Sequence, residues 1–472
     1  MNSNYKRLVN STLILSIGVI CTKLFTFLLV PFYTRWLTQN DYGVYDLIIT
    51  YTSLIVPVIT LDLAEAVFRF LLENLSDKAR SKTIVSTAIK FTLIFYTLGV
   101  CVGIPLLSRY IDVELSVLIM LLLLVEILNT LFMMVLRGIK KLTTYAISSV
   151  VFILVTFALN FVFIKMLGLG LKGIIIAYIL GYTVSIIYMF VDGGMKNYIS
   201  LKHTELGVLK NMLKYSLPLI PNAISWWIIS ASDRTIVASF LGVSSSAIIA
   251  VAHKVPNICQ TMYSVFHLSW QENASDTVNL PKAERDAYYS SIFNQMLSIL
   301  TTIQIVVLSV NFLFYRYMVE LDYFQGYFLS PILVVSLSFS MIAQFFGGIY
   351  IATKETAKNG VSTFISAVLN TVFHLVLVRT VGIFAAPIST LLSYIVLVLI
   401  RFFDIKKSIA ITMEKKNVGL LVMMMYFFSS IYINSPALNI CNLFLAALIF
   451  VLVNRTKIGA LLAGLIGKLR TM

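Results

Sequence analysis

Long apolar runs separated by short polar segments recur along almost the whole chain. Each run has roughly 17 to 25 residues, the length that a helix needs to cross about 30 Å of hydrocarbon. Residues 115–136 are apolar on nearly every helical face, whereas strands of a membrane barrel alternate apolar and polar residues. The pattern therefore predicts an all-α polytopic membrane protein, because helices satisfy their own backbone hydrogen bonds.

The runs predict about fourteen transmembrane helices. The first six cover residues 11–33, 44–66, 84–107, 116–136, 145–167 and 173–190. The next six cover residues 216–241, 247–268, 292–314, 329–351, 362–381 and 385–402, and two shorter helices cover 418–433 and 438–453. Composition agrees with this interpretation, since 59% of the 472 residues are hydrophobic and 12% are charged. The mean hydropathy of +0.91 lies outside the range of soluble domains.

Lysine and arginine are distributed unequally between the predicted loops. With the N-terminus inside, the outer segments hold only Arg35, Arg109, Lys165, Lys172, Arg316 and Arg379 of the 36 basic residues. Most of the others, including Arg69 and Arg401, fall in the inner segments or at the inner span ends. Because basic loops stay on the cytoplasmic side, we expect both termini there. This asymmetry accounts for most of the net charge of +15 without nucleic-acid binding.

The two sets of six helices have similar lengths and the same expected orientation, which is typical of a parallel structural repeat. We expect an N-terminal lobe at residues 1–195, a cytoplasmic linker at 196–214 and a C-terminal lobe at 215–404. Residues 405–472 would add two helices and a basic amphipathic tail. The tail is too short to span easily, so it should lie on the anionic inner surface.

Four basic residues fall inside predicted spans instead of loops: Lys23, Lys90, Arg234 and Lys254. A charge near the bilayer centre costs at least about 2.5 to 3.5 kcal/mol on insertion scales, so each should face a wet cavity or a partner. They are candidates for binding a negatively charged headgroup. The alternative is that each makes a structural ion pair or hydrogen bond between helices.

The acidic residues of the spans form a smaller set. Glu126 lies at the centre of the fourth span, where it either neutralises a buried cation such as Lys23 or binds a coupling proton or sodium ion. Asp62 and Glu65 lie one turn apart at the inner end of the second span. Arg69 follows Glu65 at i+4, so the simpler interpretation of this group is a local salt-bridge cluster.

Asp233 is the remaining acidic candidate for coupling or charge balance. It points about 100° away from its neighbour Arg234 on a helix, so the two are not natural partners. On the eleventh span, Asn370 and His374 share a face and are expected to hydrogen-bond across the helix bundle. For that pair we favour a structural role.

The sequence lacks the usual signatures of enzymes that act on nucleotides or esters. It contains no Walker-type phosphate loop, no HExxH pair, no Gly-x-Ser-x-Gly turn and no Rossmann glycine pattern. The four cysteines are scattered singly through apolar stretches, so neither a disulfide framework nor a CxxC metal site is indicated. We therefore expect a transporter, not an enzyme, with no metal and no cofactor beyond a coupling proton or sodium ion.

The beginning of the chain resembles a known family. The resemblance lies in residues 31–45 (PFYTRWLTQNDYGVY) and 61–66 (LDLAEA), with a fainter echo at 232–234 (SDR). These segments are similar to the polysaccharide repeat-unit flippases (Wzx type) of the multidrug/oligosaccharidyl-lipid/polysaccharide exporter superfamily. The resemblance implies a MATE-like fold, with two six-helix lobes around a central cavity that opens alternately to each side of a bacterial plasma membrane.

The resemblance also implies a cargo, which is a short oligosaccharide attached through pyrophosphate to a polyprenol. Buried cations suit such a cargo because they compensate its negative charge at low dielectric. The expected partners are this lipid, membrane lipids and other polysaccharide-assembly proteins. Three rivals stay open: a flippase for lipid II or another cell-wall precursor, a multidrug exporter of the same superfamily, and a membrane-embedded glycan polymerase or ligase.

Overall fold

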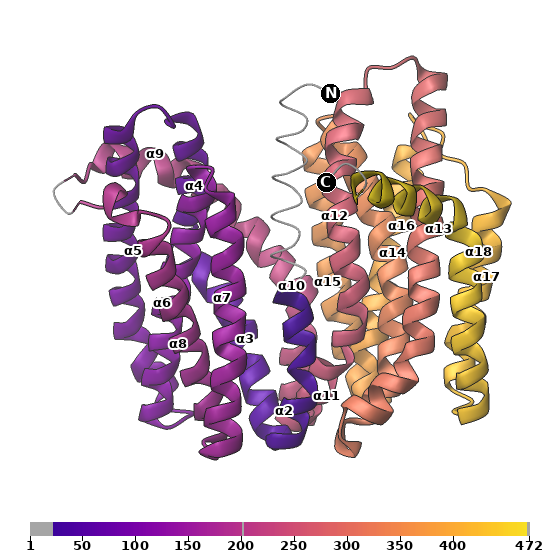
Figure 1. Ribbon diagram of the computed structural model, residues 1–472, viewed down its shortest axis with the longest axis horizontal. Coiled ribbons are helices and arrows are strands. Elements are labelled where there is room, and N and C mark those ends of the chain that lie inside the picture. The colour runs from indigo at the N-terminus through magenta and orange to yellow at the C-terminus, as the bar shows by residue number, and fades with distance from the viewer. Residues whose placement is uncertain (1–21, 201–202, 470–472) are drawn as a thin grey trace. The chain divides into compact units, whose positions relative to one another are not determined.

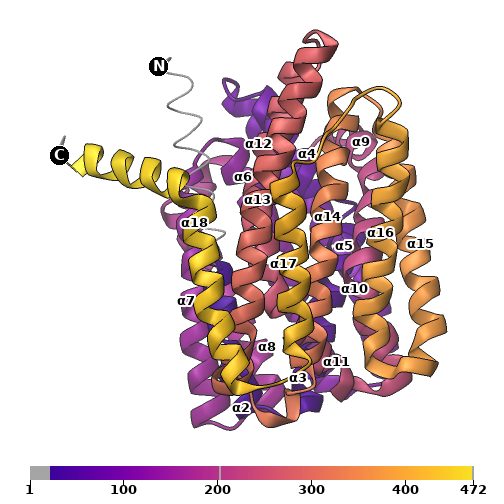
Figure 2. The same cartoon turned by 90° about the vertical axis from the view of Figure 1, so that its right-hand side faces the viewer.

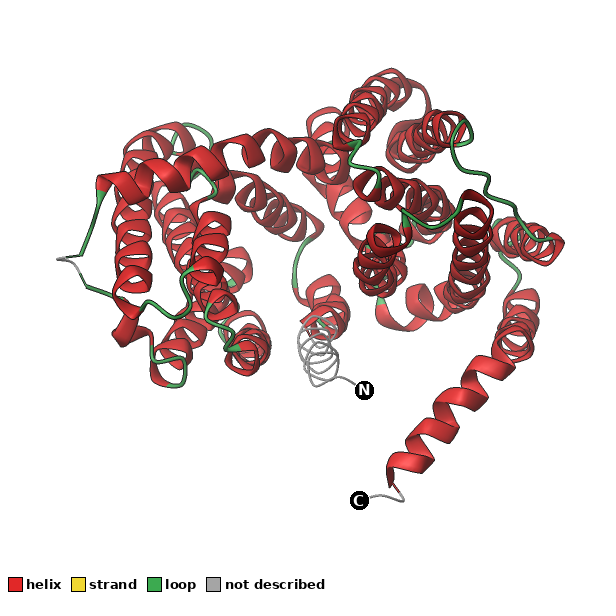
Figure 3. Ribbon diagram, turned by 90° about the horizontal axis from the view of Figure 1, so that it is seen from above, coloured by secondary structure: helices red, strands yellow, loops and turns green. Residues whose placement is uncertain are grey.

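The computed structural model describes residues 22–200 and 203–469. In this part of the chain every regular element is a helix, as Figure 3 shows by colour. The prediction of an all-α protein is confirmed. The chain divides into two compact units, unit 1 at Met1–Ala231 and unit 2 at Ser232–Met472, and the division falls inside one helix, α10 (Ile220–Leu241).

Unit 1 contains long helices that run side by side (Figure 1). Its elements are α2 (Val30–Trp36), α3 (Gln39–Ile59), α4 (Leu63–Glu73), α5 (Lys78–Leu107), α6 (Val113–Gly138), α7 (Leu142–Asn160) with a π-helical end at Phe161–Met166, α8 (Gly170–Val191), a 3-10 turn at Met195–Tyr198, α9 (Leu206–Ser216) and a 3-10 turn at Leu217–Leu219. The core lies where α4, α5, α6 and α9 meet. Leu63, Val67, Leu131, Val135 and Met212 are almost completely buried there.

The second predicted span, 44–66, is not one continuous helix. α3 ends at Ile59, and Leu61 and Asp62 take left-handed backbone angles, with φ of 51° and 53°, before α4 begins. Pro57 lies one turn upstream and lacks a backbone N–H, which weakens the helix at this point. The break is fixed by hydrogen bonds, since Ser216 donates its hydroxyl to the Leu61 carbonyl at 2.6 Å.

Unit 2 repeats the pattern of long antiparallel helices. After α10 come α11 (Val243–Ala252), α12 (Lys254–Thr277), α13 (Lys282–Leu313) with a π-helical end at Phe314–Met318, a 3-10 turn at Leu321–Tyr323, α14 (Gly326–Ala352), α15 (Thr356–Val381), a 3-10 turn at Gly382–Phe384, and α16 (Ala385–Ile405). Its core is aromatic. Trp270 stacks on Phe345 with ring centroids 4.1 Å apart, and its indole N–H donates to the Phe345 carbonyl at 2.9 Å.

The last two helices, α17 (Lys415–Ile431) and α18 (Pro436–Leu469), pack against α13 within unit 2 (Figure 2). Asparagines make the polar contacts of this interface. The Asn417 amide donates to Asn294 Oδ1 at 2.8 Å, and the Asn454 amide donates to Thr302 Oγ1 at 3.1 Å. Buried side-chain hydrogen bonds of this kind join helices within a membrane. The C-terminal turns of α18 bend away from its first part in Figure 2.

A helix occurs at the position of each predicted span that lies within the described residues. Among these residues, nine helical stretches are long and apolar enough to cross a bilayer, and the stretch Thr356–Ile405 comprises both α15 and α16. Residues 11–21 of the first predicted span, 11–33, lie outside the described residues. The count of about fourteen therefore stays a prediction.

One glycine permits the close approach of α7 and α8. A Cβ atom on Gly181 would overlap the Thr156 hydroxyl and press on the Phe152 carbonyl. We expect Gly181→Ala to lower the free energy of unfolding by about 1 to 3 kcal/mol, because overpacking forces neighbouring groups to shift. Thermal melting of the detergent-solubilised protein measures the effect.

Gly419→Ala in α17 is the matched control, since a Cβ there meets nothing within 4 Å. It should leave the melting temperature unchanged or raise it. Adding Thr156→Ala to Gly181→Ala should restore part of the lost stability by removing the overlapping oxygen. Equal melting temperatures for Gly181→Ala and the wild type would contradict the packing argument.

Candidate functional site

The motif at residues 31–45 folds into a cluster of buried tyrosines in unit 1. The ring of Tyr33 lies 5.4 Å from that of Tyr45 on α3, which in turn lies 5.7 Å from that of Tyr178 on α8. The hydroxyls of Tyr45 and Tyr178 share a hydrogen bond of 2.6 Å. Tyr42 stacks on Tyr45 and is fully buried. Each such aromatic pair is worth about 0.5 to 1.5 kcal/mol beyond its buried area, so the motif holds α2, α3 and α8 together.

Glu126 of α6 lies within electrostatic reach of this tyrosine cluster. Its charge interacts with Tyr178 and Tyr182 of α8, and Thr52 of α3 is its side-chain hydrogen-bonding partner. The Oε2 atom is buried without a hydrogen-bonding partner among the described residues. Asn129, which follows Glu126 at i+3 on α6, accepts a hydrogen bond from Ser185 at 3.1 Å. Glu126 therefore belongs to a polar layer inside unit 1.

Asp46 of α3 is a buried acid that the sequence analysis missed. Its side chain is 7% exposed, and it interacts electrostatically with Tyr178, as Glu126 does. Asp46 lies only two residues inside the predicted span 44–66, and charged side chains near span ends normally reach water. The tertiary packing of α3 against α8 buries it instead.

The predicted salt-bridge cluster at Asp62 takes a different form. Arg69 pairs with Glu73 at 3.0 Å, one turn further along α4, instead of with Glu65. Asp62 lies in the break between α3 and α4, outside the helices that are long and apolar enough to span a bilayer. Burial, together with a smaller contribution from the nearby Glu65 carboxylate, raises the pKa of the Asp62 carboxyl to about 6.

Both candidate cations of unit 1, Lys23 and Lys90, have exposed side chains. Lys90 lies at the start of a stripe along α5 in which Leu93, Ile94 and Leu98 are exposed and line a shallow groove. A stripe of exposed apolar side chains is typical of a lipid-facing surface, along which lysine extends towards water. The surroundings of Lys90 thus differ from those expected of a residue inside a polar cavity.

In unit 2, Asp233 of α10 is the centre of a buried hydrogen-bonded network. Its Oδ1 atom accepts from Nδ1 of His374 on α15 at 3.0 Å, and its Oδ2 atom accepts from the Thr390 hydroxyl on α16 at 2.9 Å. Asn370, one turn from His374, donates to Thr390 and to Ser393. Asp233 is 2% exposed and His374 is 0% exposed. Asn370 and His374 share a face of α15, as predicted. His374 contacts Asp233 directly, and Asn370 is linked to Asp233 through Thr390.

Arg234 and Lys254 are half-buried in unit 2, and each makes at least one polar or electrostatic interaction. Lys254 is the first residue of α12, directly after a break at His253 that separates α12 from α11. The eighth predicted span, 247–268, is therefore divided as the second one is. The break places Lys254 at a helix N-terminus, where a cation faces the positive end of the helix dipole.

Arg401 was placed among the residues at inner span ends, but it lies within α16 and is 3% exposed. Its guanidinium donates to the Ala343 carbonyl of α14 at 2.6 Å, and to the Asn359 carbonyl and the Thr363 hydroxyl of α15. Gly347 makes room for it, because a Cβ there would lie 2.8 Å from Nη1. Arg401 thus links α16 to α14 and α15 through neutral acceptors, and its hydrogen bonds stabilise the packing of these helices.

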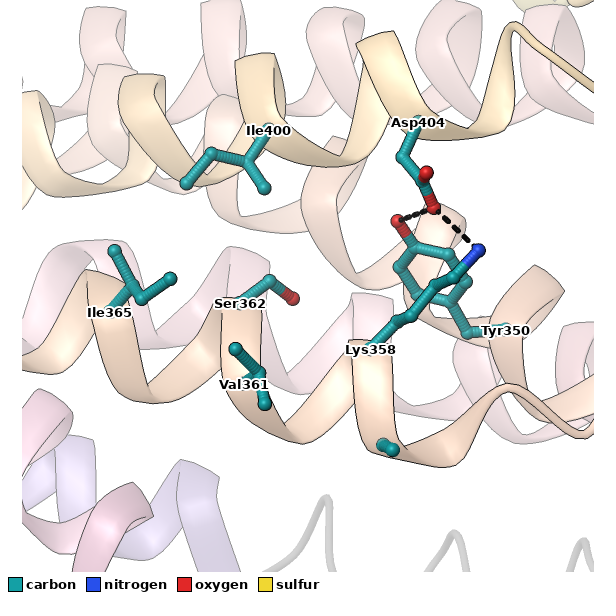
Figure 4. A pocket seen from close by; sticks show the side chains of 8 residues that line it. Tyr350, Lys358, Val361, Ser362, Ile365, Ile400 and Asp404 are labelled. Atoms are coloured by element: carbon teal, nitrogen blue, oxygen red, sulfur yellow. Dashed lines mark hydrogen bonds and ion pairs between the residues drawn. The ribbon is translucent and has the colours of Figure 1, made fainter.

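A groove of about 400 Å³ opens between α15 and α16 (Figure 4). At its polar end, the Lys358 amino group lies 3.1 Å from the Asp404 carboxylate and 2.9 Å from Glu355, and Tyr350 donates to Asp404. Its other end is apolar, with Ile400 among the lining residues. Because two carboxylates already hold Lys358, the groove is a poor site for a phosphate.

The described residues contain no group of three or more histidine, cysteine or acidic side chains arranged to hold a metal ion.

Residues 8–269 match the model of a family described as polysaccharide biosynthesis protein, which is more than half of the chain. The chain belongs to this family. The resemblance to Wzx-type flippases in its first seventy residues is thereby confirmed. No curated protein matches the chain significantly.

Solved structures of MATE transporters share the fold of this chain. An inward-facing multidrug resistance transporter of the MOP superfamily is similar with a TM-score of 0.68 and 14% identity, over 84% of this chain and 98% of that chain. An outward-facing structure of such a transporter gives a TM-score of 0.57 at 15% identity, over 84% and 95%. A MATE transporter in a bent conformation gives 0.55 at 16%, over 90% and 98%. The fold is therefore MATE-like, as predicted.

The raised pKa of Asp62 predicts a pH-dependent effect on the stability of the protein. The folded state holds a proton at Asp62 up to about pH 6 and the unfolded state only up to about pH 4, so stability falls as the pH rises through this window. Asp62→Asn removes the charge, and asparagine also tolerates left-handed angles. The variant should melt at a higher temperature than the wild type at pH 8, and this advantage should shrink towards pH 4.

The exposed acid Asp276, for which Asp276→Asn is the matched control, should show no such trend. An advantage of Asp62→Asn that is equal at pH 4 and pH 8 would mean that its carboxyl does not titrate in this window.

Proposed function

We propose that this protein is a flippase that moves polyprenyl-pyrophosphate-linked oligosaccharide repeat units from the inner to the outer leaflet of a bacterial plasma membrane. Its product would feed the assembly of a capsule, an O-antigen or another surface polysaccharide. The observation that carries this proposal is the combination of membership in a polysaccharide biosynthesis family with the fold of an exporter.

The charge distribution of unit 2 supports an anionic cargo over a cationic drug. A transporter of cations needs carboxylates that a substrate can reach. In unit 2 both oxygens of Asp233 already accept hydrogen bonds from its own side chains, and Asp404 is held by Lys358 and Tyr350. Asp233 and Asp404 are therefore both engaged internally.

The pyrophosphate group is proposed to bind to the cations Lys23, Lys90, Arg234 and Lys254. Charge balance or ion coupling is proposed for the acids Glu126, Asp62, Glu65 and Asp233. Charge-assisted hydrogen bonds from lysine or arginine to phosphate oxygens are about twice as strong as neutral ones.

Transport would proceed by alternating access. The headgroup enters a cationic cavity, the polyprenyl tail stays in the bilayer through a side opening, and a rocking motion exposes the headgroup to the outer side. A cytoplasm-negative potential favours outward movement of an anion by about 2.3 kcal/mol per charge per 100 mV. A lipid II flippase must also move a pyrophosphate group across the membrane. The attached glycan is therefore what distinguishes the two cargoes.

We expect Lys23→Ala and Arg234→Ala each to reduce surface polysaccharide by roughly tenfold or more, because a charge-assisted hydrogen bond is worth about 1.5 to 3 kcal/mol. Lipid-linked repeat units should accumulate on the inner leaflet. Surface glycan is measured by immunoblot, and the lipid-linked units by extraction and mass spectrometry. Lys407→Ala, which removes a cation with a 78% exposed side chain, is the matched control and should behave as the wild type.

Normal surface glycan in both variants would contradict the proposed anion site. In proteoliposomes, translocation of lipid II but not of an oligosaccharide repeat unit would favour the cell-wall rival. Translocation of a cationic dye with neither lipid would favour a drug exporter.

A further inference from the structure

The groove between α15 and α16 changes from apolar to charged along its length (Figure 4). At one end it is lined by Ile365 of α15 and Ile400 of α16. At the other end Lys358 and Asp404 form an ion pair of 3.1 Å, and Ser362 lies between the two ends. The groove is therefore amphipathic along its axis, and the proposed translocation of the headgroup uses none of these residues.

The apolar end of the groove lies at the depth of the hydrocarbon. Residues 359–378 of α15 contain no lysine, arginine, aspartate or glutamate, and the stretch Thr356–Ile405 is apolar enough to cross a bilayer. Val361, Phe364 and Val368 are 60%, 57% and 45% exposed, at the spacing of one helical face. Exposed apolar side chains on a spanning helix contact lipid chains, so an acyl chain suits this end of the groove.

A buried cation lies beside the middle of the groove. Arg401 of α16 is 3% exposed, and its Nε atom donates to the Ser362 hydroxyl at 3.0 Å. Its other hydrogen bonds go to carbonyl and hydroxyl oxygens, and it forms no ion pair with any described residue. It also interacts electrostatically with Tyr350, which lines the groove. Because charges act strongly at low dielectric, Arg401 favours a negatively charged group at this depth.

The polar end of the groove has more negative than positive charge in close contact. The single amino group of Lys358 lies 2.9 Å from Glu355 and 3.1 Å from Asp404. Lys407 lies 3.6 Å from the other oxygen of Asp404, but its side chain is 78% exposed, so this pair is weak. Two carboxylates therefore share one close cation, and a further positive group with N–H donors would complete the set.

These charges follow the order of the groups in a zwitterionic phospholipid. From the hydrocarbon outward, the groove has apolar side chains, then the buried cation Arg401, then the carboxylates of Asp404 and Glu355. A phospholipid with an amine headgroup has its acyl chain, its phosphate and its ammonium in the same order. A lysine amino group has three N–H donors, so Lys358 keeps one for a phosphate oxygen.

The same groups disfavour other headgroups. An anionic phospholipid brings a phosphate without an ammonium, and its charge would lie beside Glu355 and Asp404 without compensation. A choline headgroup is zwitterionic, but its quaternary ammonium has no N–H to donate to a carboxylate. A primary ammonium supplies both the charge and the donors.

We propose that the groove between α15 and α16 is a binding site for a membrane phospholipid with a primary-amine headgroup, such as phosphatidylethanolamine. The acyl chain lies along Ile365 and Ile400, and the phosphate accepts from Lys358 beside the charge of Arg401. The ammonium donates to Glu355 and Asp404. The site lies within unit 2, and it does not depend on the proposed cargo.

The first experiment compares three lipids on the wild type. The full-length protein in detergent is titrated with phosphatidylethanolamine, phosphatidylcholine or phosphatidylglycerol of identical acyl chains, and native mass spectrometry measures the bound lipid. Phosphatidylethanolamine should bind at least about tenfold more tightly than the other two, because this factor corresponds to one charge-assisted hydrogen bond. Equal affinities, or tighter binding of phosphatidylglycerol, would overturn the proposal.

The second experiment tests the carboxylates. Asp404→Asn and Glu355→Gln should each lower the affinity for phosphatidylethanolamine by about tenfold and leave that for phosphatidylcholine unchanged. Glu205→Gln, which breaks an exposed ion pair in unit 1, is the matched control and should keep the wild-type preference. A preference for phosphatidylethanolamine that survives in both groove variants would show that the headgroup binds elsewhere.

The third experiment tests the path of the acyl chain. Val361→Trp fills the groove with a large side chain and should weaken the binding of phosphatidylethanolamine severalfold. Val376→Trp is the matched control, because Val376 lies on the same helix, is 64% exposed and does not line the groove. Equal binding by the two variants would contradict the proposed site. Size-exclusion profiles show whether each variant is folded, and the comparison of lipids on the wild type needs no variant.

Discussion

The cost of placing charge and unpaired polar groups in hydrocarbon governs this structure more than any other interaction. It explains why the buried cation Arg401 is surrounded by carbonyl and hydroxyl oxygens from two neighbouring helices. It also explains why Asp233 accepts a hydrogen bond at each of its oxygens. Arg401 and Asp233 are thus each tied to two neighbouring helices, so the same contacts that compensate their charges also fix how these helices pack.

Helix packing in a membrane gains little from burying apolar surface, because lipid is as apolar as the side chains. The protein relies instead on close contact and on polar links. Gly181 and Gly348 allow neighbouring groups to approach to distances that a Cβ would forbid. Asn417 and Asn454 attach the last two helices to α13. These links make α17 and α18 an integral part of unit 2.

The sequence predicted the features that depend on one helix at a time. Apolar runs gave the helix positions, and the residues at 31–45 and 61–66 indicated the family. It did not predict which side chains of different helices contact each other. Periodicity places His374 on a face of α15, but it does not show that this face contacts Asp233 on α10. Asp46 and Arg401 were overlooked for a related reason, since both lie near span ends and only tertiary packing buries them. The break at Leu61 and Asp62 was not predicted, because a single proline such as Pro57 usually kinks a membrane helix without ending it.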